Sequence, residues 1–114
     1  MEKKETKLPE GITQEMIDGA KVKHGADKVK LVEILKENSD EVDKTVLAVV
    51  PSRNIMSMFV QHMDSNVKKA QEILVKNCLL SHKEEVLADD ALFLGAVNGI
   101  AELIPIRKAR IKNC

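Results

Sequence analysis

The sequence predicts an α+β fold, with an N-terminal short helix and a β-hairpin followed by a three-helix C-terminal region. Two β-rich runs separated by a polar turn predict the hairpin. After the proline that ends the second run, apolar residues recur at helical spacing almost to the C-terminus. A length of 114 residues fits one domain, and 44% apolar residues supply its core.

The N-terminal part divides into a tail and a short helix. Residues 1–12 are charged and polar, and we expect them to be a mobile tail before a single α+β domain over residues 13–114. Thr13 is a good helix N-cap, and Gly25 can close the helix in a left-handed conformation.

The hairpin is expected over about residues 28–50. Residues 28–36 and 45–50 are its β-rich strands, and the polar stretch 37–41 is its turn. An isolated hairpin is marginal in water, and both strands carry apolar residues on both faces. We therefore expect it to pack on helices, or to pair with another strand or another copy of the chain.

The helical region is expected over about residues 52–112. We predict three helices, at about residues 53–63, 65–80 and 90–104. Ser81 and Glu84 have the spacing of a capping box. Pro105 should kink or interrupt the last helix.

Composition argues against several classes of partner. Lysine plus arginine and aspartate plus glutamate both number 18, so there is no general attraction to nucleic acid or anionic membrane. Two Phe and no Trp or Tyr leave little aromatic surface for stacking on bases. The charged N-terminus predicts no signal peptide, and no apolar run approaches the ~20 residues that span a bilayer. We expect a protein of a reducing cytoplasm, with Cys78 buried and no disulfide.

The residues do not predict catalysis, a metal site or a cofactor. His24, His62 and His82 are scattered, and we interpret them as solvated or hydrogen-bonded side chains rather than zinc ligands. Phosphate-binding loops, dinucleotide fingerprints and nucleophile elbows are absent from the sequence. Gly95 and Gly99 are spaced for close approach of another helix or the hairpin.

Two segments are candidates for partner binding. The apolar residues of helix 53–63, among them Met56, Phe59 and Met63, cover an arc of about 200° at 100° per residue. A surface helix needs only about 100°, so this arc predicts core burial or, alternatively, a flexible methionine surface for a partner. The second segment is basic and contains Arg107, Lys108 and Arg110. It is interpreted either as favourable charge at a helix C-terminus or as a docking site for an acidic partner.

The order of these features resembles a known family. The hairpin ends in Pro51-Ser52-Arg53, a helix carrying Asp64 follows, and then come the segments AQEILVKNCLL (residues 70–80) and DDALFLGA (residues 89–96). Over about residues 25–110 the chain resembles small tailed-phage and prophage proteins placed among the tail-assembly chaperones. The family often has a Trp and glycines after the helical cysteine, where this chain has Leu79-Leu80-Ser81-His82.

The resemblance implies a function without catalysis. Proteins of this family hold the long tape-measure protein soluble while tail-tube subunits assemble, and they are not expected in the finished virion. We therefore expect a chaperone-like protein of the host cytoplasm that reversibly covers a hydrophobic helical client, such as a tape-measure or tube protein. A structural phage protein and a general helical protein–protein adaptor are the alternatives, and each allows a homo-oligomer.

Overall fold

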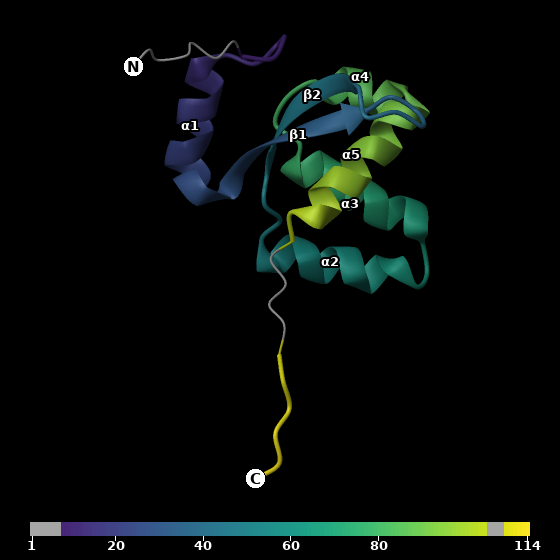
Figure 1. The fold of residues 1–114 in the computed structure, drawn as a ribbon. Helices are drawn as coiled ribbons and strands as arrows, with labels where there is room; N and C mark the ends of the chain where they lie inside the picture. The colour runs from purple at the N-terminus through teal and green to yellow at the C-terminus, as the bar shows by residue number, and fades with distance from the viewer. Residues whose placement is uncertain (1–7, 105–108) are drawn as a thin grey trace.

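The computed structural model describes residues 8–104 and 109–114 and confirms the α+β fold (Figure 1). Its elements are α1 (Gln14–His24), a 3-10 turn η1 (Ala26–Lys28), β1 (Val29–Leu35), β2 (Val42–Val49), α2 (Arg53–Met63), α3 (Val67–Cys78), α4 (Lys83–Ala88) and α5 (Asp90–Glu102).

The hairpin lies where the β-rich runs predicted it. β1 and β2 pair antiparallel, with Leu31 opposite Leu47. β2 begins at Val42, three residues before the predicted start at residue 45, because Val42 and Lys44 pair with Leu35 and Ile34 across a register shift. The polar turn is closed by a 2.8 Å hydrogen bond from the Lys36 amide to the Glu41 carbonyl.

One face of the hairpin packs on α3 and α5 and forms the main core. α5 contacts both strands, α3 and α4, so it is the central helix of the fold. The buried side chains of this core come from the strands, α3, the segment after it, α4 and α5: Val32, Ile34, Val46, Ala48, Val49, Leu74, Val75, Cys78, Leu79, Val86, Ala96 and Ile100.

The opposite face of the hairpin packs on α1. Val29 and Leu47 from this face form a second core cluster with Ile12, and apolar side chains of α1 cover it. Figure 1 shows the result as layers, with α1 on one side of the hairpin and α3 and α5 on the other. Helices therefore cover both faces, and within the described ranges the sheet has two strands plus a single bridge between Ala48 and Leu79.

The N-terminal boundary differs from the prediction. Ile12, placed in the tail by its charged surroundings, is buried against the hairpin. Its amide donates to the Pro9 carbonyl in a turn at 3.1 Å. The packed domain thus begins before residue 13; residues 1–7 lie outside the described residues.

Over its described residues, the helical region has four helices rather than the predicted three. α2 has the predicted bounds and is capped by Ser52, whose hydroxyl accepts from the Ile55 amide. α3 is shorter than predicted because Asn66 caps it, with its side chain accepting from the Lys69 amide at 3.0 Å. The additional helix is α4, a six-residue helix.

The last helix also ends earlier than predicted. α5 stops at Glu102, and residues 109–112, which were assigned to the helical region, are in neither helix nor strand. The sequence supplies a reason, since a residue before a proline is disfavoured in helical conformation and Pro105 lies three positions beyond Glu102.

Candidate functional site

Helix α2 lies at the surface of the molecule beside α3, and none of its residues is fully buried. Only one side of the helix packs inward: Ile55 and Phe59 contact the main core. The wide apolar arc is therefore not explained by burial within this chain. This is the exposure that partner binding through α2 requires.

The outward side of α2 carries an apolar stripe. Met56, Val60 and Met63 are spaced i, i+4 and i+7, so they lie along one face of the helix. Met56 is partly buried, Met63 is exposed and Val60 is 63% exposed. We call these three residues the α2 stripe. A shallow surface depression beside it is lined by Arg53, Met56, Ser57, Val60 and Gln61.

The predicted partner-binding residues of α2 thus fall into two groups. Met56 and Met63 belong to the α2 stripe, whereas Phe59 packs against the core. Val60 was counted in the apolar arc but was not selected as a binding residue, because periodicity alone does not tell the inward half of a wide arc from the outward half.

The basic segment is described only in part. Arg107 and Lys108 lie outside the described residues. Arg110 is exposed, in a stretch without helix or strand. Both interpretations of Arg110, favourable charge near a helix C-terminus and docking of an acidic partner, stay predictions.

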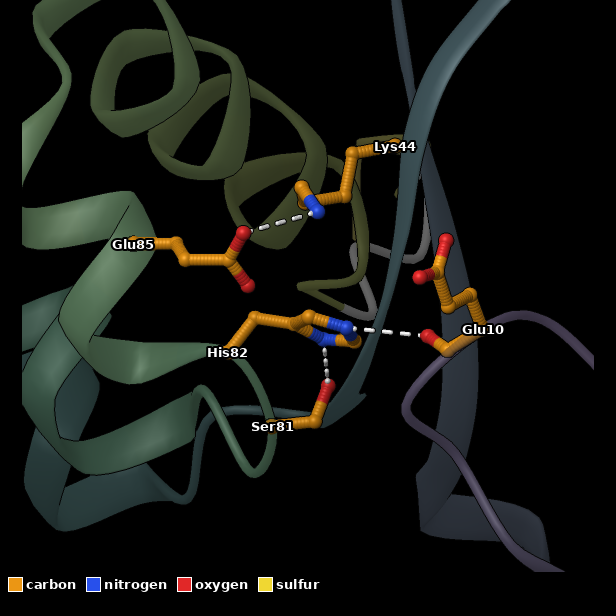
Figure 2. Close-up of polar contacts among 5 residues, drawn as sticks. All are labelled: Glu10, Lys44, Ser81, His82 and Glu85. Atoms are coloured by element: carbon orange, nitrogen blue, oxygen red, sulfur yellow. Dashed lines mark hydrogen bonds and ion pairs between the residues drawn. The ribbon is translucent and has the colours of Figure 1, made fainter.

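A polar cluster joins three distant parts of the chain (Figure 2). The Ser81 hydroxyl accepts from the Leu47 amide at 2.8 Å and lies 2.7 Å from Nδ1 of His82. Nε2 of His82 lies 3.0 Å from the Glu10 carbonyl oxygen. Because a carbonyl only accepts, Nε2 carries the proton and the Ser81 hydroxyl donates to Nδ1. Every polar atom of this relay then has a partner.

This serine–histidine contact is built for structure. Ser81 is 5% exposed, so a substrate has little access to its hydroxyl. His82 has a left-handed backbone, with φ of 56°, which is costly for a residue with a Cβ. The hydrogen bonds of its ring hold that conformation. Nearby, Lys44 and Glu85 form an ion pair at 3.2 Å that joins β2 to α4 (Figure 2).

The predicted capping box at Ser81 and Glu84 is wrong. The N-cap of α4 is His82, and no side chain caps the helix. The Ser81 hydroxyl is instead used by the edge of β2 and by the histidine ring. Sequence spacing could not reveal this, because the competing donor, the Leu47 amide, is 34 residues away.

A second surface feature is a groove between β1 and α5 with a volume of about 770 Å³. Its walls are the edge of β1, residues 31–35, the C-cap residue Leu103, and the α5 positions Ala91, Gly95, Asn98, Gly99 and Glu102. Two of its polar side chains, Glu33 and Glu102, are acidic. This groove is not predictable from the sequence, because it depends on which strand edge stays uncovered.

Comparisons with known proteins add no assignment. No family model, no curated protein and no solved structure matches this chain. Over residues 8–104 and 109–114, no three His, Cys, Asp or Glu side chains group as a metal site would need. No helix in this same part of the chain has the length and apolar character to cross a bilayer.

Proposed function

We propose that this chain is a protein-binding module that reversibly covers a hydrophobic helical client with the outward face of α2. The observation that carries the proposal is the α2 stripe, in which the exposed Val60 and Met63 and the partly buried Met56 lie along one face of a helix. Aligned apolar side chains left in water favour association with a complementary apolar surface. Methionine side chains are unbranched and adapt to irregular surfaces, which suits a client that is bound and released.

The resemblance to tail-assembly chaperones supports a specific client within this proposal. The client would be a phage tape-measure protein, a long helical chain that needs its apolar surface covered before the tube forms. The tube protein is the second client of this kind. The proposed location is the cytoplasm of the host cell, where tail proteins are made and assembled, and the role requires no catalysis.

A structural phage protein and a general helical adaptor are the alternatives. The chaperone leaves before assembly ends, whereas a structural protein stays at fixed stoichiometry in purified particles. Mass spectrometry of assembling lysates and of purified virions separates these two. An adaptor would bind helical partners of unrelated sequence with comparable affinity.

The client proposal is tested by replacing the methionines of the α2 stripe. The double variant Met56→Gln, Met63→Gln keeps side-chain length and flexibility but removes apolar surface. We expect at least a roughly tenfold loss of affinity for a co-purified tape-measure segment, measured by calorimetry. Because α2 has no fully buried residue, the melting temperature should fall by only a few degrees.

The control is Val22→Gln on α1, which removes an apolar side chain that is 88% exposed and lies away from α2. It should leave client affinity unchanged. Normal stability with unchanged binding in the double variant would refute the role of the stripe. A collapse of the melting temperature would instead place these methionines in the core.

A further inference from the structure

The two outer edges of the hairpin differ in how they are covered. At β2, the Leu47 amide donates to Ser81 and the Leu47 carbonyl accepts from the Leu80 amide at 2.7 Å. Leu31 is paired directly opposite Leu47. In an antiparallel ladder, opposite residues either bond to each other or both point outward, so Leu31 also directs its amide and carbonyl away from β2.

The same alternation directs the backbone of Glu33 outward. Within the described part of the chain, no hydrogen bond from outside the hairpin reaches the backbone of Leu31 or Glu33. The side chains of Leu31 and Leu35 are 45% and 47% exposed. This edge of β1 has the unpaired backbone groups and the apolar contacts that accept an added strand.

The groove beside this edge determines which strand fits. On the α5 side its floor is formed by the small residues Gly95 and Gly99 and by Val32 and Ile34, which pack on them. Glu33 lies on the opposite face of β1 together with the exposed Leu31 and Leu35, since side chains alternate along a strand. An added strand should therefore be apolar on its α5 side and carry long basic side chains on the other, where their methylene stems can cover the leucines and their charges can reach Glu33.

The C-terminal residues of this chain have that pattern. Ala109, Arg110, Ile111 and Lys112 alternate between apolar and basic side chains. All four are exposed, and Ile111 is 95% exposed. Figure 1 shows residues 109–114 extended and apart from the helices and strands of their own chain.

We propose that residues 109–112 of a second copy of this chain add to the outer edge of β1 as a third strand. Ala109 and Ile111 would face α5 within the groove. Arg110 and Lys112 would lie on the face of Glu33 and neutralise its charge. Two chains that exchange these segments reciprocally form a closed dimer, in which each copy fills the edge of the other. The proposal is independent of the α2 stripe.

The first experiment removes the added strand. We would measure the mass of the full chain and of a chain ending at residue 108, both under reducing conditions so that Cys114 forms no disulfide, by size exclusion with light scattering. The full chain should have twice its 12.7 kDa mass at micromolar concentrations, and the shortened chain should be a monomer. A monomeric full chain would overturn the proposal. A shortened chain that remains dimeric would overturn it too, and would indicate direct pairing of two β1 strands.

The second experiment identifies the chain that supplies the strand. Glu33→Lys and Arg110→Glu should each weaken the dimer by roughly tenfold, because each places like charges together. In a mixture of the two variants, the lysine introduced at position 33 of one chain meets the glutamate introduced at position 110 of the other. The unchanged Glu33 and Arg110 then meet at the second contact, so the heterodimer should be tighter than either homodimer.

Two further variants complete this experiment. The first carries Glu33→Lys and Arg110→Glu on the same chain. If this double variant alone recovers wild-type behaviour and does so as a monomer, the strand is added within one chain and the second-copy proposal is wrong. Val22→Lys, a charge change on α1, is the control and should leave the dimer unchanged.

Discussion

Gly95 and Gly99 determine how closely α5 approaches β1. A Cβ built at Gly95 would lie 2.6 Å from Cγ2 of Ile34, and one at Gly99 would collide with Cγ1 of Val32. The spacing of these glycines predicted close approach of a helix or of the hairpin, and the strand is the neighbour. The contact seals the main core at the floor of the groove.

Gly99→Ala should therefore destabilise the fold although alanine is the better helix former. We expect a loss of about 1–3 kcal/mol in the free energy of unfolding, measured in urea, because the added methyl pushes on a buried strand. Gly19→Ala in α1 is the matched control, since nothing lies within 4 Å of its Cβ position. That change should stabilise by about 0.5–1 kcal/mol. Equal gains at both positions would show that α5 and β1 are not in this contact.

The helices and strands whose apolar residues recur with a clear period could be predicted from the sequence. The hairpin and helix 53–63 follow from alternation and helical spacing, since each pattern is local. The fourth helix, α4, was missed because it has six residues and its first turn carries no capping side chain. The open edge of β1 was not predictable either, because the tertiary contacts of residues 80 and 81 decide that the β2 edge is the covered one.

The candidate site on α2 could be predicted only in part, because its apolar pattern is local but its orientation is not. The apolar arc of α2 was visible in the sequence, but which half faces outward depends on the position of α3. Phe59 was therefore grouped with Met56 and Met63, although it packs inward. Distinguishing them required the tertiary structure.

Ser81 joins the start of α4 to the hairpin, so removing its hydroxyl should weaken the attachment between these two elements. Ser81→Ala leaves the buried Leu47 amide without its acceptor, so we expect a cost of about 1–3 kcal/mol in the free energy of unfolding. Glu84→Gln tests the capping box and should stay within about 0.5 kcal/mol of wild type. Chemical denaturation of both variants decides between the two roles. A large effect of Glu84→Gln with a neutral Ser81→Ala would restore the capping box.

For the whole molecule, the two cysteines report on the integrity of the main core. Cys78 is buried, and this burial raises the pKa of its thiol from 9.0 to about 11. Cys114 is exposed. At pH 8 roughly one Cys78 thiol in a thousand would be ionised, and only the thiolate reacts readily.

Titration with DTNB at pH 8 should therefore detect one fast thiol in the native protein and two in denaturant. Cys114→Ser should abolish the fast phase and leave the slow one. Since the unfolded thiol ionises near pH 9 and the folded one near 11, the contribution of the neutral Cys78 thiol to stability should fall as pH rises through this range. Two fast thiols in the native state would mean that the layer formed by α3 is open.

The contact between His82 and the Glu10 carbonyl joins residues 72 positions apart, and this constrains the order in which the protein folds as it is made. The N-terminal segment leaves the ribosome first, but its hydrogen-bond partner is synthesised 72 positions later. At about 5–20 residues per second, that delay is roughly 4–15 s. During this interval Ile12 and α1 have only their apolar packing on the hairpin and lack the hydrogen bond from His82. The layer that is translated first is thus completed only after most of the chain exists.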